Sequence, residues 1–198
     1  MTKEVDFKTI QDTLGKISPI STQTATDLLS VSQIKTIKKN TLIEISGQYI
    51  KYQFVVMSGI VRKFLINTVG EEFTLDFFTD GQAITPVLLR SVDLVSFVNL
   101  QVVSNEATIL FFSYKEMEAT MQGYKDLEAF GYKVMMQDAY KRADREKILL
   151  TATGTEKLEW FRRNYPGLEN EIPHYYIASF LGLTPTSFSR LRNPKNFS

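Results

Sequence analysis

The spacing of apolar residues changes twice along the chain and predicts three kinds of structure. Residues 5–32 are expected to form short helices, because apolar side chains recur there at helical intervals: Val5, Phe7, Ile10 and Leu14. From about residue 34 to residue 113 the pattern becomes a series of short runs rich in Val, Ile, Phe and Thr, separated by turns that contain Gly or Asn. Short strands at such regular spacing predict an antiparallel sandwich, roll or barrel.

A helical pattern returns at about Lys125 and continues to about Leu150. Its apolar positions are Leu127, Phe130, Val134, Met135, Ile148 and Leu149. A helix of about 25 residues is roughly 37 Å long, which is long for a globular protein. Such a helix can pack against its own sheet, link two domains or form the seam of a dimer. We favour the dimer seam.

Three more helices are expected after a Thr-Gly-Thr break. The first, TEKLEWFRRNYP, is expected to be capped by Thr155 and to end before Pro166. A loop, PGLENEIP, separates it from a helix over residues 174–181 and from a last helix that begins after Thr184. Gly182 between these two can take the left-handed conformation that ends a helix. The pair is therefore predicted to be a helix-turn-helix.

The last helix combines a small apolar side with a polar, cationic one. Phe188 and Leu191 are three residues apart and are expected to face inward. The outward positions are Pro185, Thr186, Ser189 and Arg190, with Ser187 and Arg192 at the flanks. Arginine can bind guanine O6 and N7 together, and hydroxyl groups and helix N-terminal amides suit phosphate oxygens. This side suits the major groove of DNA; the alternative is an ordinary helical hairpin with a polar surface.

The charge distribution favours the DNA interpretation. The net charge is only +1, yet residues 141–198 hold ten Lys or Arg against six Asp or Glu, and the preceding 140 residues carry a net charge of −3. From Ile172 onward there are three basic residues and no acid. Such asymmetry indicates that the C-terminal part binds a polyanion.

Composition excludes several chemistries. The chain has no cysteine, which rules out disulfides, thiolate metal sites, iron–sulfur clusters and thiol catalysis. The chain has a single histidine, His174, which argues against a catalytic relay and excludes a multi-histidine metal site. We expect His174 to be a polar residue near a helix start. No catalytic residue, metal ligand or cofactor is therefore predicted. No apolar run approaches the roughly 20 residues that cross a bilayer, and no signal core is visible, so we expect a cytoplasmic protein.

Residues 172–192, IPHYYIASFLGLTPTSFSRLR, resemble the C-terminal helix-turn-helix of the Crp/Fnr family of bacterial transcription regulators, in its Bacteroidetes-type form. The preceding TEKLEWFRRNYPGL is similar to the lead-in of that group. The resemblance covers nearly the whole chain and implies an α+β fold. It implies an N-terminal antiparallel β-roll (a double-stranded β-helix) with flanking helices, a long linking and dimerisation helix, and a helix-turn-helix domain. The expected domains are a cyclic-nucleotide-binding-like sensor over 1–123, the helix over 124–150 and the DNA-binding domain over 151–198.

The resemblance also implies how DNA is read. Arg190 matches the base-reading arginine of the family, and Pro185 and Thr186 occupy the other base-facing positions. These two depart from the Arg-Glu pair of the best-known reader, so a different operator is expected. The candidate DNA-binding residues are Thr184, Pro185, Thr186, Ser187, Ser189, Arg190 and Arg192. The implied partners are double-stranded DNA with a pseudo-palindromic site, a second copy of the chain along the long helix, and RNA polymerase.

The cyclic-nucleotide cassette that this family uses is incomplete here. The resemblance implies a Gly-Glu step that binds the ribose and, some ten residues later, an Arg that neutralises the cyclic phosphate. Thr85-Pro86 stands at the Gly-Glu position, residues 95–98 contain no base, and Arg90 comes about five residues early. We therefore expect no cyclic AMP binding of the usual kind, and instead either a different, more apolar small-molecule effector or a filled core. The candidate pocket residues are Thr85, Pro86, Arg90, Ser91, Ser96 and Phe97.

Two other functions compete with a transcription regulator. One is a ligand-binding or scaffold β-roll whose terminal helices bind protein instead of DNA. Steep salt dependence of binding to DNA would separate it from the first hypothesis. The other is a cupin-type enzyme, which would need a His and carboxylate metal site inside the roll. No His precedes residue 174, so an enzyme is not expected.

Overall fold

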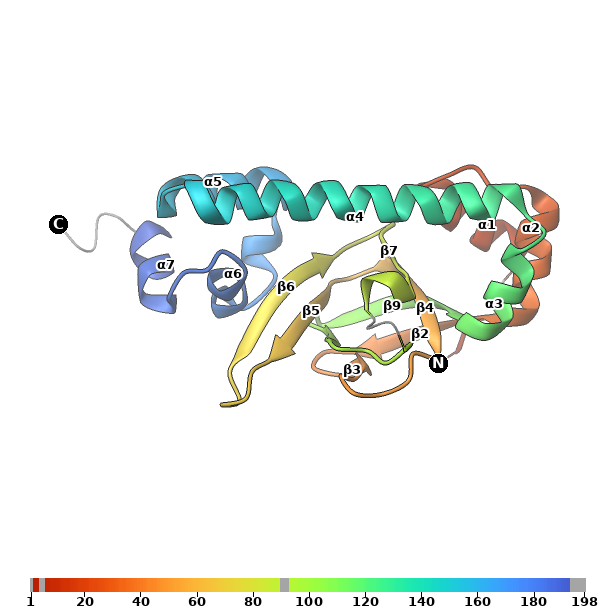
Figure 1. Cartoon of the computed structure of the whole chain (residues 1–198), viewed down its shortest axis with the longest axis horizontal. Coiled ribbons are helices and arrows are strands. Elements are labelled where there is room, and N and C mark those ends of the chain that lie inside the picture. The colour runs from red at the N-terminus through yellow and green to blue at the C-terminus, as the bar shows by residue number, and fades with distance from the viewer. Residues whose placement is uncertain (1, 4–5, 90–92, 193–198) are drawn as a thin grey trace. The chain divides into compact units, whose positions relative to one another are not determined.

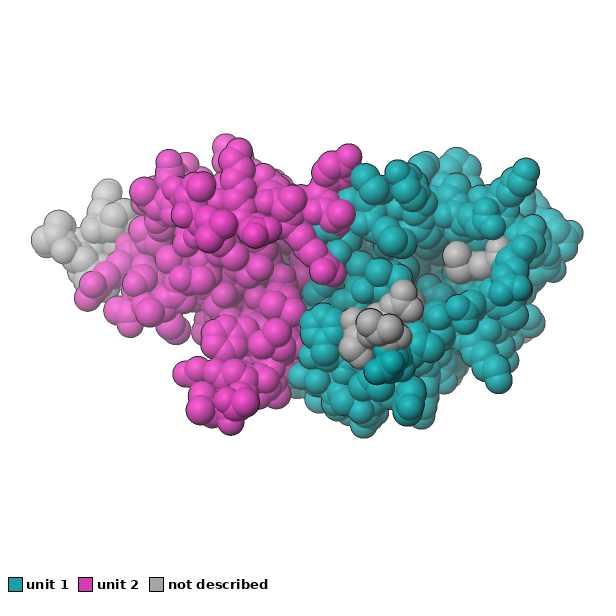
Figure 2. All heavy atoms as spheres, in the orientation of Figure 1, with its two compact units in different colours: residues 1–63, 77–138 teal, residues 64–76, 139–198 magenta. Residues whose placement is uncertain are grey.

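The computed structural model of the protein describes residues 2–3, 6–89 and 93–192. The chain divides into two compact units, which Figure 2 shows in two colours. Unit 1 comprises residues 1–63 and 77–138, and unit 2 comprises residues 64–76 and 139–198.

Short helices form the N-terminal part of unit 1, as the apolar spacing predicts. They are α1 (Phe7–Gly15), α2 (Thr22–Asp27) and the 3-10 helix η1 (Leu28–Val31). Asp6 caps α1 by accepting a hydrogen bond from the Thr9 amide at 2.7 Å. Ile10 and Leu14 are fully buried, so the apolar side of α1 faces the core of the unit.

The strands within the described residues form two sheets (Figure 1). They are β1 (Thr2–Lys3), β2 (Ser32–Lys38), β3 (Leu42–Glu44), β4 (Tyr52–Ser58), β5 (Val61–Ile66), β6 (Glu72–Phe78), β7 (Ala83–Ile84), β8 (Asn99–Val102) and β9 (Glu106–Ser113). One sheet has the order β1-β2-β9-β4-β7, and the other has the order β3-β8-β5-β6. The pairs β2–β9, β4–β9 and β3–β8 are antiparallel, as predicted for a roll.

The core of unit 1 lies around β4 and β9. Residues 54–56 and 109–112 are buried at every position, without the alternation of a half-exposed strand. Helix α1 contacts β4, and α3 (Tyr114–Met121) contacts β9, so these helices help to cover the sheet. The rings of Phe54 and Phe111 meet edge to face with centroids 5.2 Å apart.

The predicted long helix is α4 (Lys125–Thr151), which runs without a break (Figure 1). Leu127, Phe130 and Val134 are buried, so the first half of α4 packs within unit 1. Tyr132 and Met135 are exposed. The helix therefore buries one apolar side and presents another. None of the helices in the described ranges is long and apolar enough to cross a membrane.

Unit 2 contains the predicted C-terminal helices. They are α5 (Gly154–Asn164), the 3-10 helix η3 (Leu168–Asn170), α6 (His174–Phe180) and α7 (Pro185–Arg192). The predicted cap of α5 was wrong, because Thr153 and not Thr155 caps it. The Thr153 amide donates to the Glu156 carboxylate at 2.7 Å, which lowers the pKa of Glu156, and the Glu156 amide donates to the Thr153 hydroxyl. This capping box needs an acid three residues after the cap, a spacing that Thr155 lacks.

Candidate nucleic-acid interface

Helices α6 and α7 form a helix-turn-helix whose turn is fixed by local hydrogen bonds. Gly182 has a φ of +63°, in the left-handed region that favours glycine. The Leu183 amide donates to the Ala178 carbonyl at 2.9 Å. The Thr184 hydroxyl accepts a hydrogen bond from the Ser187 amide at 3.1 Å and lies 2.9 Å from Ser187 Oγ. Thr184 therefore caps α7, as predicted from the sequence.

The inner side of α7 packs on α5 and α6. Phe188 is 1% exposed, and its ring centroid lies 5.8 Å from that of His174. Leu191 lies against Gly154, the first residue of α5, where an added Cβ would be 2.9 Å from Leu191 Cδ1. A larger residue at position 154 would therefore push Leu191 away. Phe188 and Leu191 face inward, as the spacing predicts.

The outer side of α7 is polar and exposed. Six of the candidate DNA-binding residues lie here and are exposed: Thr184, Pro185, Thr186, Ser187, Ser189 and Arg190. The first turn of α7 contains no acid, and the last turn contains Arg190 and Arg192. The structure thus brings six candidates together within seven consecutive residues, of which only Phe188 is buried.

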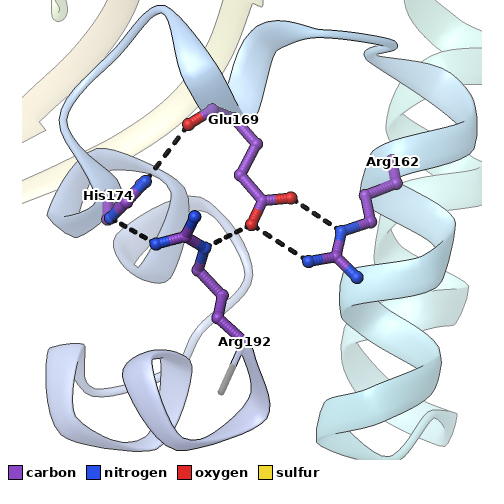
Figure 3. Close-up of polar contacts among 4 residues, drawn as sticks. All are labelled: Arg162, Glu169, His174 and Arg192. Atoms are coloured by element: carbon purple, nitrogen blue, oxygen red, sulfur yellow. Dashed lines mark hydrogen bonds and ion pairs between the residues drawn. The ribbon is translucent and has the colours of Figure 1, made fainter.

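Arg192, the seventh candidate, is held within unit 2 (Figure 3). Its Nε donates to Glu169 Oε1 at 2.5 Å, and its side chain is only 28% exposed. Glu169 also accepts hydrogen bonds from Arg162, from Nε at 2.6 Å and from Nη2 at 3.0 Å. The hydrogen bonds from Arg162, reinforced by Arg192, hold the pKa of the Glu169 carboxyl below its ordinary value. Sequence reasoning missed Glu169.

His174 completes this group, which we call the Glu169 cluster: Arg162, Glu169, His174 and Arg192. His174 Nδ1 lies 3.1 Å from Arg192 Nη1, and Nε2 lies 3.2 Å from the Glu169 carbonyl oxygen. Arginine can only donate, so Nδ1 accepts, and Nε2 carries the proton that it donates to the carbonyl. His174, the first residue of α6, is thus the polar residue near a helix start that the sequence predicts.

The C-terminal end of α6 rests on Arg145 of α4. Arg145 Nη2 donates to the Phe180 carbonyl at 2.7 Å, and the guanidinium lies 4.4 Å from the centroid of the Phe180 ring. On α5, Trp160 stacks on Phe180 at 6.2 Å and donates from Nε1 to Asp144 at 2.7 Å. Burial lowers the pKa of Arg145. These contacts fix α6, and with it the turn, on α4 and α5.

The far half of the β5–β6 hairpin, residues 64–76, also belongs to unit 2. The Thr74 amide donates to Ser179 Oγ of α6 at 2.9 Å. Asp76 is 6% exposed, accepts a hydrogen bond from the Tyr165 hydroxyl at 3.1 Å and pairs with Lys141 at 2.7 Å. Burial raises the pKa of Tyr165, which keeps its hydroxyl protonated as a donor. Asp76 therefore ties the hairpin to α4 and α5.

The candidate pocket residues of unit 1 are only partly assembled. Thr85 is buried, and among the described residues its Oγ1 has no hydrogen-bond partner. Ser96 instead donates to the Val98 carbonyl at 2.8 Å, and Phe97 is half exposed. Pro86 lies in the 3-10 helix η2 (Pro86–Leu88). Arg90 and Ser91 lie outside the described residues.

Thr85 lines a cavity of about 400 Å³. The other lining residues are Gln53, Val87, Tyr114, Met117, Glu118, Gln122, Glu128, Phe130, Gly131 and Met135. The cavity wall is mainly apolar, with two carboxylates and no base among these residues. Over the described ranges, no group of three or more His, Asp and Glu side chains could hold a metal ion.

No protein-family model matches the sequence, and no curated protein matches it. Solved structures do match. FixK2 from Bradyrhizobium japonicum has a TM-score of 0.72 and 16% identity, over 84% of this chain and 85% of that one. A Crp/Fnr-family regulator from Eubacterium rectale has a TM-score of 0.70 and 16% identity, over 89% and 84%. CLP from Xanthomonas campestris, described as a c-di-GMP responsive global regulator, has a TM-score of 0.69 and 15% identity, over 89% and 92%.

These matches show the fold of this chain. It is the α+β fold of Crp/Fnr regulators, with an N-terminal β-roll, a long helix and C-terminal helices, as predicted from the sequence. Function does not follow from a shared fold at this level of identity; it depends on the residues of the site.

Proposed function

We propose that this protein is a DNA-binding transcription regulator of the Crp/Fnr type and not an enzyme. The observation that carries the proposal is the exposed, acid-free side of α7, with Arg190 on it, beside a turn and cap fixed by hydrogen bonds. In this proposal residues 1–123 are the sensor, 124–150 the linking helix and 151–198 the DNA-binding domain. The protein would act in the bacterial cytoplasm, where RNA polymerase is its partner at promoters.

Each exposed residue of α7 has a proposed role. Arg190 binds guanine O6 and N7, and Pro185 and Thr186 face the neighbouring bases. The hydroxyl groups of Thr184, Ser187 and Ser189 bind phosphate oxygens, together with the N-terminal amides of the helix. Pro185 and Thr186 offer one hydroxyl and apolar surface, so contact with a thymine methyl group suits them.

The proposed active form is a homodimer along α4. Exposed residues recur on this helix three or four positions apart: Tyr132, Met135, Ala139, Arg142, Glu146 and Leu150. This is the spacing of a two-stranded helical seam. The buried residues Leu127, Phe130 and Val134 lie on the other side, which leaves this stripe for a second copy. A two-fold dimer of this kind places its reader helices about 34 Å apart, one turn of DNA.

Selection of bound sequences from a random DNA pool tests the proposal. At near-physiological salt and without added ligand, we expect a two-fold-symmetric site of about 20 base pairs. Affinity for that site should fall by orders of magnitude between about 50 and 200 mM salt. Weak salt dependence and no enriched sequence would contradict DNA reading and favour a protein partner for α6 and α7.

Arg190→Ala is expected to weaken binding to the selected site by about 1–3 kcal/mol, roughly 5- to 150-fold, and to relax the preference at one base pair per half-site. The reason is the loss of two hydrogen bonds to one guanine. Fluorescence anisotropy with single-base variants of the site measures both effects. Arg163→Ala is the matched control, because Arg163 is an exposed arginine of α5 outside the reader helix. Equal losses in both variants would mean that Arg190 contributes only charge.

We further propose that the sensor binds no cyclic AMP and takes a neutral or cationic apolar ligand. The described residues that line the 400 Å³ cavity support this, since they include Glu118 and Glu128 but no base for a cyclic phosphate. The buried hydroxyl of Thr85 is a ready hydrogen-bond partner for such a ligand. Calorimetric titration with cyclic AMP should therefore show no binding up to millimolar concentration. Micromolar affinity would contradict this assignment.

A further inference from the structure

We propose that Glu169 determines the DNA specificity of this protein as a positioning residue, by withholding Arg192 from the DNA phosphates and fixing the end of α7. This inference rests on the proposed function as a DNA reader. It concerns Arg192, a residue of the predicted DNA-binding set that the structure engages with Glu169.

The geometry of the Glu169 cluster leaves Arg192 little freedom. Arg192 is the last residue of α7, and its Nε and Nη1 reach Glu169 and His174, respectively (Figure 3). Both carboxylate oxygens of Glu169 accept hydrogen bonds from arginines, and the residue is 9% exposed. A phosphate that drew Arg192 out of the cluster would break both of its contacts at once. Arg190, two positions earlier, is exposed.

Removal of the Glu169 charge should therefore have two effects of opposite kind. Arg162 and Arg192 would be left side by side without the anion between them, and Arg192 would turn toward solvent and DNA. A released arginine adds a phosphate contact that is the same on every sequence, so non-specific binding rises. The end of α7 also loses its tie to η3, so base contacts weaken and specific binding falls. The ratio of specific to non-specific affinity therefore decreases, because specific affinity falls while non-specific affinity rises.

A neighbouring acid provides the matched control. Glu171 lies two residues from Glu169 at the end of η3, is exposed and is not part of the cluster. Glu171→Gln removes the same charge from the same segment as Glu169→Gln. Any effect of overall charge on DNA affinity appears in both variants, whereas loss of the cluster appears only in Glu169→Gln.

The experiment measures binding of the full chain to the selected site and to a scrambled duplex over a range of salt concentrations. For Glu169→Gln we expect the affinity ratio to fall at least about 10-fold and the salt slope on scrambled DNA to steepen by about 0.9 per protomer, one phosphate contact. Glu171→Gln should change the ratio less than about 2-fold. In Glu169→Gln/Arg192→Gln the slope should return to that of the wild type, while the ratio stays low.

Arg192→Gln separates the inference from the simplest alternative and does not depend on Glu169→Gln being well folded. With Glu169 in place, loss of Arg192 should weaken specific binding and leave the salt slope unchanged. A slope that becomes shallower by about one per protomer would mean that Arg192 already binds phosphate, which overturns the inference. Equal effects of Glu169→Gln and Glu171→Gln overturn it as well. A wild-type protein without salt-dependent DNA binding would instead overturn the proposed function.

Discussion

Replacing Tyr132 by glutamate is expected to separate the proposed dimer into monomers. Tyr132 is 65% exposed in the single chain, although it is a large aromatic residue; it is the first residue of the α4 stripe. Tyrosines of this kind often contribute about 2 kcal/mol or more to an interface. A two-fold axis brings both copies into the same interface, so the dissociation constant of the dimer should rise by about 1,000-fold. Sedimentation equilibrium over a range of protein concentrations measures this change.

Gln137→Glu is the control for Tyr132→Glu. It introduces the same charge on the same helix at an exposed position. Gln137 is two residues from Met135 and therefore lies on nearly the opposite side of the helix from the stripe. The dimer should tolerate it. The Tyr132→Glu monomer should also lose affinity for the full palindrome but keep weak binding to a half-site, because it retains one reader helix. If Tyr132→Glu remains a dimer, the contact between copies lies outside this stripe.

The helix-turn-helix was predictable because its determinants are local. Gly182, Thr184 and Pro185 specify the end of α6, the cap of α7 and its first turn, and each acts on residues no more than five positions away. The same holds for α4, whose apolar residues recur at helical spacing over 127–135 and again at 148–149. The cap of α5 was missed because two threonines compete for it. Only Thr153 has an acid at the third position after it, and this decides between them.

Contacts between distant residues were not predictable from one sequence. Helical spacing indicates on which side of α7 a residue lies, but it does not indicate which residues of other elements contact that side. Arg192 was therefore assigned to DNA, and its contact with Glu169, 23 positions earlier, was missed. Ser179 was left without a role, and it binds the Thr74 amide 105 positions away. Among the described residues the buried hydroxyl of Thr85 has no partner, and this likewise depends on how η2, α3 and α4 surround it.

Removal of the Asp76 carboxylate is expected to destabilise unit 2 by about 3 kcal/mol. Asp76→Ala removes the acceptor at 3.1 Å from the buried Tyr165 hydroxyl and the carboxylate that pairs with Lys141 at 2.7 Å. Breaking one side of a buried ion pair typically costs about 3–5 kcal/mol. Lys141 is 27% exposed, so water can solvate its ammonium group in the variant. The expected cost therefore lies at the lower end of that range. Asp76→Asn keeps an acceptor for Tyr165 and should cost about half as much.

Hydrogen exchange of the full chain tests this prediction, because it reports the free energy of opening for each segment separately. Asp80→Ala serves as control, since Asp80 is exposed and should cost less than about 0.5 kcal/mol. The amides of β6 and α6 should lose protection together in Asp76→Ala, because the Thr74 amide binds Ser179 of α6. Loss of protection in β6 alone would mean that the hairpin opens by itself and that α6 depends on Arg145 and Trp160. In that case the helix-turn-helix would keep its DNA affinity when the Asp76 contacts are broken.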